Sequence, residues 1–161
     1  MRAAVLTVSD RVSAGEAEDG TGALLEALLR GDRYEVTRRL VPDEAEQIAR
    51  AIAELAADAA LVLTTGGTGL AARDVTPEAT RSVIEREVPG IAQAIRADSI
   101  ARTAHGMLSR GLAGTLGRTL VVNLAGSPGA CRDGYAVLSA GLPHALGLLG
   151  DGERVIDHDQ T

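Results

Sequence analysis

The chain has 161 residues, of which 45% are hydrophobic, and its formal net charge is −6. This length favours one domain, and this hydrophobic content excludes a disordered chain. All 16 basic residues are Arg, and the only aromatic residues are two Tyr. We therefore expect no nucleic-acid partner, because such partners are held by basic grooves and aromatic stacking.

Apolar runs and cysteine content predict where the protein acts. No apolar run approaches the roughly 18 residues that span a membrane, so no membrane partner is expected. The first apolar run is too short for a secretion signal. The single cysteine, Cys131, cannot form an internal disulfide. These features predict a cytoplasmic protein.

The spacing of apolar residues predicts strands and helices that alternate along the chain. In chain order we expect a strand at 2–8, a helix at 21–29, a strand at 34–41, a helix at 43–57, a strand at 59–63, helices at 77–87 and 91–103, strands at 111–116 and 119–124, and helices at 128–138 and 142–149. This order predicts one α/β domain over residues 1–150 with a largely parallel sheet. Residues 151–161 are expected to form a loose tail.

Four of the predicted strands end in small or polar residues. These ends read TVSDR (7–11), VPDE (41–44), TTGGTG (64–69) and LAGSPG (124–129). In parallel sheets, ligands bind beyond the carboxyl ends of the strands. We therefore expect the four segments to form one site.

The TTGGTG segment fits neither of two common nucleotide loops. A Walker A loop needs a Lys, and the chain has none. Gly67, Gly69 and Ala72 match the GxGxxA pattern of dinucleotide sites, but that loop runs straight into its helix. Here the helix is expected to begin at Pro77 with Thr76 as its N-cap, so a dinucleotide site is not favoured.

Two interpretations of this loop remain. Glycines at 66, 67 and 69 can expose successive backbone N–H groups as a phosphate or nucleotide cradle, to which Thr65 and Thr68 add hydroxyls. Alternatively, the glycines only allow a tight turn at the end of a buried strand.

Two aspartates near the strand ends also have two interpretations each. Asp43 is placed to cap a helix, with Glu46 at the N3 position of a capping box. Asp74 is placed to bond the local backbone ahead of the next helix. Together, however, two carboxylates beside a glycine loop suggest a Mg²⁺ site, because Mg²⁺ takes one or two carboxylates plus substrate phosphates.

The remaining candidates are weaker when each is taken alone. Ser127 and Pro128 are placed at the N-cap and first turn of a helix, where they serve as ordinary caps or as part of an anion site. Arg73 is either a solvated charge or a phosphate contact. Cys131 lies within a predicted helix and is expected in the core.

Several of these motifs resemble one family. TVSDR, LVPDE, LVLTTGGTGLAARDVTPEAT, MLSR and NLAGSPGA followed by LPHALGLL are similar to the MogA/MoaB family of molybdopterin adenylyltransferases, which includes the G domain of gephyrin. The resemblance extends from Val5 to about Leu149. It implies a three-layer α/β/α sandwich with a mostly parallel sheet, and usually a homotrimer.

The resemblance also implies a reaction and its residues. Molybdopterin would receive an adenylyl group from Mg-ATP, with release of pyrophosphate, and the product would pass to a MoeA-type molybdenum insertase. Asp43 and Asp74 would be catalytic, and Asp74 would hold Mg²⁺. The expected substrate-binding residues are Thr65, Gly66, Gly67, Thr68, Gly69, Ser9, Asp10, Arg73, Ser109, Ser127 and Pro128. The alternative is a non-catalytic protein that only binds molybdopterin.

Overall fold

A single sheet forms the centre of the molecule in the computed structural model, which describes residues 1–150. The sheet has six strands in the order β2-β1-β3-β6-β5-β4. Strands β1, β2, β3 and β6 are parallel, whereas β5 runs antiparallel to β6 and β4 antiparallel to β5. The strands are β1 (Arg2–Val8), β2 (Glu35–Val41), β3 (Leu61–Thr65), β4 (Arg86–Glu87), β5 (Ala113–Leu116) and β6 (Thr119–Leu124). The tail expected over residues 151–161 lies outside the described residues.

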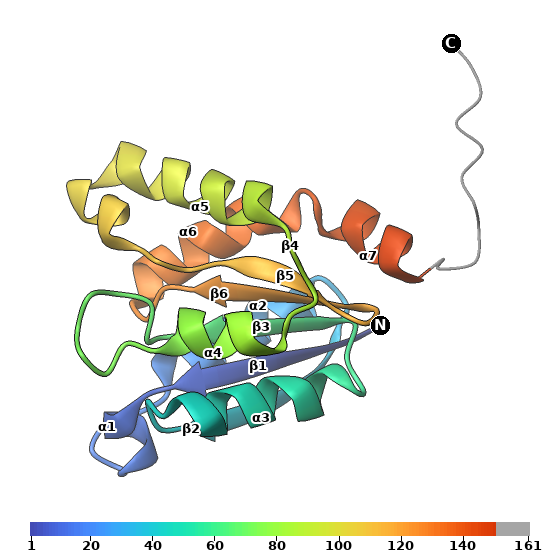
Figure 1. Ribbon diagram of the computed structural model, residues 1–161. Helices are drawn as coiled ribbons and strands as arrows, with labels where there is room; N and C mark the ends of the chain where they lie inside the picture. The colour runs from blue at the N-terminus through green and yellow to red at the C-terminus, as the bar shows by residue number, and fades with distance from the viewer. Residues whose placement is uncertain (151–161) are drawn as a thin grey trace, which may run out of the picture.

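Helices cover both faces of the sheet, which confirms the three-layer α/β/α architecture (Figure 1). One face carries α2 (Gly20–Gly31), α5 (Pro89–Arg102), α6 (Pro128–Ser139) and α7 (Leu142–Gly150), and the other carries α3 (Ala45–Ala56) and α4 (Thr76–Val83). Two short helices stand at loops: α1 (Asp10–Ser13) and the 3-10 helix η1 (Ala104–Leu108).

The two layers of core follow from the alternation of side chains along the strands. In β3, Leu61 and Leu63 join the core beneath α2 and α6, whereas Val62 joins the core beneath α3 and α4. All three side chains are fully buried. A strand that is apolar on both faces is typical of a parallel sheet with helices on each side, so the continuous apolar run of β3 is explained.

The order of the strands fixes where a ligand can bind. From β1 the chain crosses by α2 to β2 at one edge, and from β2 it crosses by α3 to β3 on the other side of β1. The connection that leaves β1 leads to α2 on one face of the sheet, and the connection that leaves β3 leads to α4 on the other face. This arrangement opens a crevice beyond the carboxyl ends of these two strands.

The main error of the sequence prediction is the helix expected at 77–87. Helix α4 ends at Val83, and Arg86–Glu87 form the edge strand β4, which pairs antiparallel with Gly114 and Thr115 of β5. The backbone N–H of Glu85 donates to the Thr115 carbonyl at 2.7 Å. Pairing at the edge of the sheet therefore replaces the last turn of the helix. The short helices α1 and η1 were not expected either.

A buried polar network connects the centre of the sheet to α4. Asn123 donates to the hydroxyls of Thr64 and Thr80, both at 2.9 Å, and Thr80 donates to the Thr76 carbonyl at 2.8 Å. These four side chains are at most 5% exposed. Because buried polar groups are costly unless they are bonded, the network holds the start of α4 at a fixed place beside β3 and β6.

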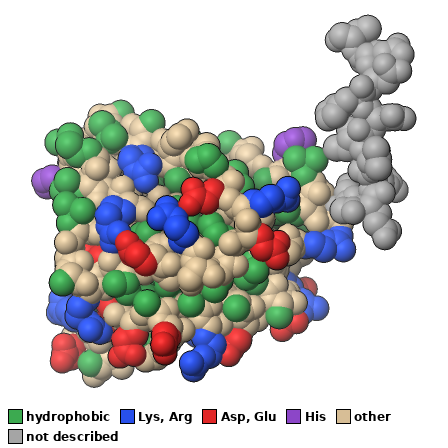
Figure 2. Space-filling model, viewed as in Figure 1, with side chains coloured by type: hydrophobic (Ala, Val, Ile, Leu, Met, Phe, Trp, Pro, Cys, Tyr) green, Lys and Arg blue, Asp and Glu red, His purple; other side chains and the backbone are tan. Residues whose placement is uncertain are grey.

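The helices and the surface charges bear on possible membrane and nucleic-acid partners. None of the helices within residues 1–150 combines the length and apolar character needed to cross a bilayer. On the face seen in Figure 2, basic side chains are interspersed with acidic ones. The viewed face therefore offers no continuous positive patch to a polyanion such as nucleic acid.

The first glycine of the TTGGTG segment is required by a close approach of two backbones. Gly66 has φ +100°, and a Cβ atom there would lie 2.2 Å from the carbonyl oxygen of Val8. On its other side, Gly66 meets Gly126 of the neighbouring strand end, where a Cβ would lie 3.1 Å from the Gly66 Cα. The ends of β1, β3 and β6 can meet only because these positions lack side chains.

We expect Gly66→Ala to lower the free energy of unfolding by about 3 kcal/mol or more, because it adds backbone strain and a clash with backbone atoms. Gly117→Ala is the matched control. Gly117 also has positive φ, but nothing lies within 4 Å of its Cβ position, so only about 1–2 kcal/mol should be lost. Urea unfolding of both variants tests this. Equal losses would contradict the close approach at Gly66.

Candidate functional site

A cavity of about 410 Å³ opens at the carboxyl ends of β1, β2, β3 and β6. Of the residues expected from the sequence, seven line this cavity: Ser9, Asp43, Thr65, Gly66, Gly67, Asp74 and Pro128. The first turn of α2 also lines it, through Gly20 and Thr21. The four strand ends therefore meet around one space, as the sequence predicts.

A second cavity, of about 280 Å³, lies on the other side of the segment that joins β6 to α6. Gly126 and Pro128 line the first cavity, whereas Ser127 and Gly129 line the second. Ser109, also expected in the site, lines the second cavity. The remaining expected residues line neither of these two cavities: Asp10, Thr68, Gly69 and Arg73.

Every backbone carbonyl group of the glycine loop, residues 66–69, accepts a hydrogen bond. Thr76 donates its hydroxyl to the Gly66 carbonyl at 2.9 Å and its N–H to the Gly67 carbonyl at 3.1 Å. Arg110 donates its backbone N–H to the Thr68 carbonyl at 2.9 Å and its Nε to the Gly69 carbonyl at 2.7 Å. All four carbonyl groups of the loop are thus bound by two residues.

The N–H groups of the same loop are in the opposite situation. Within the part of the chain that the structure describes, the N–H groups of Gly67, Thr68 and Gly69 donate no hydrogen bond to the protein. Gly67 and Gly69 are half-exposed. Successive N–H groups left free in this way are the donors that bind an anion in a backbone nest. The geometry therefore fits the cradle interpretation, although the glycines also serve the turn.

The sequence predicts Thr76 as the N-cap of α4, and the structure shows that this is wrong. The N-cap position is Val75, and Thr76 is the first residue of the helix. Its hydroxyl binds the glycine loop instead, because the loop packs against the start of α4. A Cβ atom at Gly67, whose φ is +66°, would lie 2.4 Å from the Thr76 hydroxyl.

Asp43 does not cap α3 either, so the expected capping box with Glu46 is wrong. The N-cap position is Glu44, one residue later. Asp43 instead pairs with Asp10 at the end of β1. The N–H of Asp10 donates to Asp43 Oδ2 at 2.8 Å, and the N–H of Asp43 donates to Asp10 Oδ1 at 3.0 Å. Each carboxylate thus accepts the other residue's backbone N–H, which ties the ends of β1 and β2 together.

The pKa values of the two carboxyl groups of this pair are shifted in opposite directions. The guanidinium of Arg73, together with the Asp43 N–H, lowers the pKa of Asp10. Burial raises the pKa of Asp43, and the negative charges of Asp10 and Asp74 raise it further. Asp43 is therefore a partly desolvated carboxylate in a negative field, which a bound cation would relieve.

Asp74 makes the kind of local bond that its position suggested. Its Oδ2 accepts the N–H of Ala71 at 2.9 Å, and its own N–H donates to the Ala71 carbonyl at 2.9 Å. A Cβ atom at Gly69 would lie 2.9 Å from Asp74 Oδ2. The absence of a side chain at Gly69 therefore allows the carboxylate to lie against the loop while it also lines the first cavity.

Arg73 and Arg110, the two basic residues that contact Asp10 and the glycine loop, are both paired with protein groups. Arg73 binds the Asp10 carboxylate through two nitrogens, with NH2 to Oδ1 at 2.9 Å. Arg110 binds the glycine loop and the Glu78 carboxylate. The described lining of the first cavity contains four carboxylates and no basic side chain: Glu18, Asp19, Asp43 and Asp74.

Sequence reasoning missed the contribution of the loop before α2. Asp19 is the N-cap of α2, where it accepts the Gly22 N–H at 2.9 Å and the Thr7 hydroxyl at 2.9–3.0 Å. The sequence holds a signal for this feature, because Asp is strongly preferred at the N-cap position of a helix. This helix start places the positive end of the α2 dipole at the cavity, which favours an anion.

Two further residues singled out in the sequence, Ser127 and Cys131, lie at the start of α6 and inside it. Ser127 occupies the N-cap of α6 with Pro128 as the first helical residue, but within residues 1–150 its hydroxyl makes no capping bond. Cys131 is fully buried, and burial raises its pKa to about 11. Its thiol is therefore neutral at pH 7, which confirms it as a core residue.

The donor chemistry of the first cavity fits Mg²⁺. In the part of the chain that is described, no group of three or more His, Cys, Asp or Glu side chains could enclose a metal ion. Two carboxylates, Asp43 and Asp74, are present instead. This pair suits Mg²⁺, which binds to one or two carboxylates and completes its shell with water and substrate phosphates.

Comparison with known proteins gives one family and many relatives. The family model described as "Probable molybdopterin binding domain" matches residues 4–144. A Drosophila melanogaster protein named "Molybdenum cofactor synthesis protein cinnamon" is 41% identical over 152 residues, which cover 91% of this chain and 25% of that protein. The chain spans between 22% and 47% of the length of three curated relatives, this protein among them.

Other relatives are covered over most of their length. The "Molybdopterin adenylyltransferase" of Helicobacter pylori (strain J99) is 33% identical over 150 residues, which cover 90% of this chain and 85% of that protein. The crystal structure of the molybdopterin biosynthesis enzyme MoaB from Thermus thermophilus superposes with a TM-score of 0.86 and 45% identity, covering 92% of this chain and 95% of that one.

We expect Asp43→Asn to change the free energy of unfolding by less than about 1 kcal/mol at pH 7. The pKa of Asp43 is raised above 3.8 in the folded protein, so its ionisation opposes folding, fully above the folded pKa and not at all below 3.8. The stability of the variant relative to the wild type should therefore decrease as pH falls from 7 toward 4. Urea unfolding across this range measures it.

Asp58→Asn is the control for this experiment, since the Asp58 side chain is 84% exposed. This variant removes a carboxylate from the surface, so it corrects for the general effect of losing one negative charge. If Asp43→Asn instead became relatively more stable as the pH fell, the Asp43 carboxylate would be stabilising the fold, and the direction assigned to its pKa would be wrong.

Proposed function

The chain belongs to the probable molybdopterin binding domain family, and we propose that it transfers an adenylyl group from ATP to molybdopterin. One observation carries this proposal. Three free N–H groups of the glycine loop stand beside two carboxylates at the carboxyl ends of the parallel strands. The name of the Helicobacter pylori relative and its coverage support the same activity.

The reaction needs positioning more than a covalent catalyst. A terminal phosphate oxygen of molybdopterin attacks the α-phosphorus of ATP, and the bond between the α-phosphorus and its bridging oxygen breaks. The products are adenylylated molybdopterin and pyrophosphate. Such transfers depend on in-line placement and neutralisation of charge. A site without a catalytic triad or a reactive thiol, as here, is sufficient for this chemistry.

In this proposal the first cavity holds the nucleotide. Gly67 lines this cavity and donates its N–H to phosphate oxygens, and the N–H groups of Thr68 and Gly69 continue the row of donors beyond the cavity lining. The first turns of α2 and α6 add the positive ends of two helix dipoles. Thr65 and Ser9 line the cavity. Because no basic side chain lines it among the described residues, these backbone donors are the main protein groups for the phosphates.

Asp43 and Asp74 are the residues that would hold Mg²⁺. The bound ion supplies charge neutralisation to the phosphates. The protein's part is to fix the two carboxylates in place. The bond from Ala71 fixes Asp74, and the paired backbone bonds with Asp10 fix Asp43. Arg73 supports this arrangement through Asp10 rather than through a substrate contact.

The second cavity is the proposed pterin side of the site. Ser109 and Ser127 line it, and Arg96 lines it as well. The guanidinium of Arg96 donates to the carbonyls of Ser109 and Gly111 at 3.0 and 2.8 Å, which holds this wall in place. The thin segment 126–129 separates the two cavities, so two substrates bound in them would meet at its edge.

Further parts of the proposal rest on the family resemblance. We propose a homotrimer, because an apolar groove of about 350 Å³ lies between α5, α6 and α7 and could be covered by a neighbouring subunit. We also propose that the product passes to a molybdenum insertase of the MoeA type and that the protein acts in the cytoplasm.

We expect Asp74→Asn to lower the rate of adenylyl transfer by about 100-fold or more, because Asn keeps the size of the side chain but loses the charge. Pyrophosphate release with ATP and molybdopterin measures the rate. Glu54→Gln is the control, since it removes an exposed carboxylate on α3 and should leave the rate unchanged. Near wild-type turnover of Asp74→Asn would contradict the role of Asp74. If the wild-type chain bound molybdopterin but released no pyrophosphate, the protein would be a non-catalytic binder.

We expect light scattering to give a mass near three times the 16.5 kDa of one chain. Every residue assigned to the site comes from one subunit, so activity in mixtures of wild-type and Asp74→Asn chains should fall in proportion to the mutant fraction. A steeper fall would show that subunits share their sites. A monomeric mass would rule out the trimer.

A further inference from the structure

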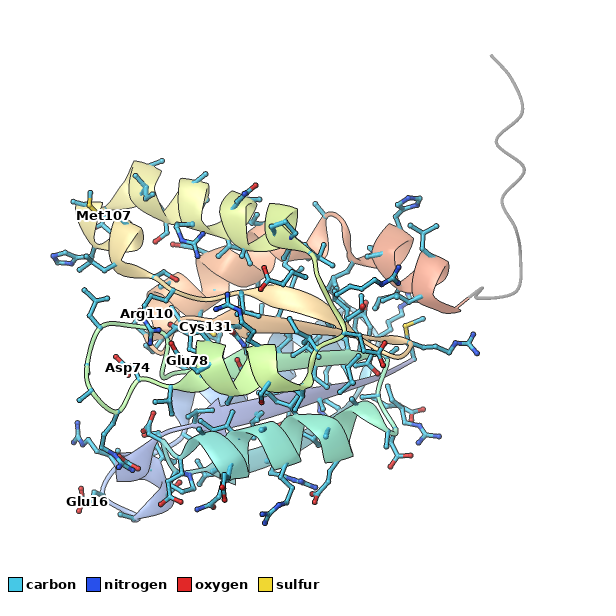
Figure 3. All side chains as sticks on the ribbon, in the orientation of Figure 1. Glu16, Asp74, Glu78, Met107, Arg110 and Cys131 are labelled. Carbon is cyan, nitrogen blue, oxygen red and sulfur yellow. The ribbon has the colours of Figure 1, made fainter. Side chains whose placement is uncertain are left out.

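Arg110 lies at the junction of three elements that meet beside the glycine loop. It precedes β5, and its side chain is 34% exposed. Its guanidinium donates from Nε to the Gly69 carbonyl at 2.7 Å and from NH2 to the Asp74 carbonyl at 2.6 Å. Its NH1 pairs with the Glu78 carboxylate of α4. Figure 3 shows Arg110 and Glu78 close together, beside the segment that carries Asp74.

All the donor nitrogens that face the loop are used by this arrangement. The planar guanidinium presents its N–H groups in a rigid fork, and three of its nitrogens each bind a protein oxygen. Arg110 does not line the first cavity. Its chemistry therefore differs from that of a phosphate ligand, whose N–H groups must remain available to the substrate.

The segment from Gly69 to Asp74 depends on this clamp. Leu70, the large hydrophobic residue of this segment, is 67% exposed, so its side chain packs little against the rest of the protein. The internal bonds of the segment are those between Ala71 and Asp74. Its attachments to the rest of the protein are the Arg73 side chain, which pairs with Asp10, and Arg110, which binds the Gly69 and Asp74 carbonyls. Arg110 is thus the residue that holds its backbone.

We propose that Arg110 is a positioning residue that holds the carbonyl groups of Gly69 and Asp74, and thereby orients the loop N–H groups and the Asp74 carboxylate for the nucleotide. This inference rests on the proposed function for its catalytic consequence. Its structural part, the clamp on the segment 69–74, can be tested on the protein without any substrate.

The structural test compares Arg110→Lys with Glu78→Gln in the full chain. A Lys ammonium keeps the charge but cannot span both carbonyls and Glu78, whereas Glu78→Gln leaves the bonds to the carbonyls in place. We expect amide exchange at Ala71 and Asp74 to accelerate about tenfold or more in Arg110→Lys. In Glu78→Gln it should stay within about twofold, since exposed ion pairs contribute little.

The functional test is a double-mutant cycle. We expect Arg110→Lys to lower kcat by about 10- to 100-fold. Calorimetry measures the affinity for Mg-ATP. Arg110→Lys should lower this affinity when Asp74 is present and should have little further effect in the Asp74→Asn variant. Such non-additivity distinguishes action through Asp74 from a general loss of stability, which would add to the Asp74→Asn effect.

Two results would overturn the inference. Unchanged exchange at Ala71 and Asp74 in Arg110→Lys would show that the clamp does not restrain the loop. Accelerated exchange throughout β1 and β3 would show that Arg110 stabilises the whole domain instead. If exchange accelerated only in the segment but the wild-type protein did not turn over ATP and molybdopterin, the clamp would stand and the proposed function would fail.

Discussion

Four successive carbonyl groups, from Gly66 to Gly69, are bound by only two residues, Thr76 and Arg110. This set of hydrogen bonds is the constraint on which the site depends. It fixes the loop with the N–H groups of Gly67, Thr68 and Gly69 free among the described residues, and it requires backbone conformations that favour glycine at positions 66 and 67. Thr76 is in turn held by the buried network through Thr80 and Asn123 to the sheet. The rigidity of the core is thereby transmitted to the loop.

A second constraint is electrostatic. The chain has no Lys, and the Arg residues near the site, Arg73 and Arg110, are paired with carboxylates and carbonyls. The first cavity is consequently acidic, and the backbone bonds between Asp10 and Asp43 keep carboxylates close together. A polyphosphate entering such a space needs a cation to accompany it. Under the proposed function, phosphate transfer in this acidic space would rely on backbone donors, helix termini and a divalent ion.

Local sequence patterns predicted the features that depend on local spacing. The strand at 119–124 and the meeting of four strand ends were correct, because alternation and apolar runs reflect burial in a parallel sheet. The patterns failed where distant partners decide the outcome. Asp43 looked like a helix cap, but its partner Asp10 is 33 residues away. Arg86–Glu87 were predicted to be helical, but they pair as a strand with the edge of β5. Neither partner can be identified from the local sequence.

The most direct measurement is a crystal structure of the full chain with Mg²⁺ and a non-hydrolysable ATP analogue, such as α,β-methylene-ATP. We predict that the phosphates lie against the N–H groups of Gly67, Thr68 and Gly69, with the metal ion bound by Asp74 or Asp43. Arg110 should keep its bonds to the carbonyls of Gly69 and Asp74. Phosphates bound instead in the second cavity beside Ser109 and Ser127, with the glycine loop empty, would contradict the proposed role of the loop.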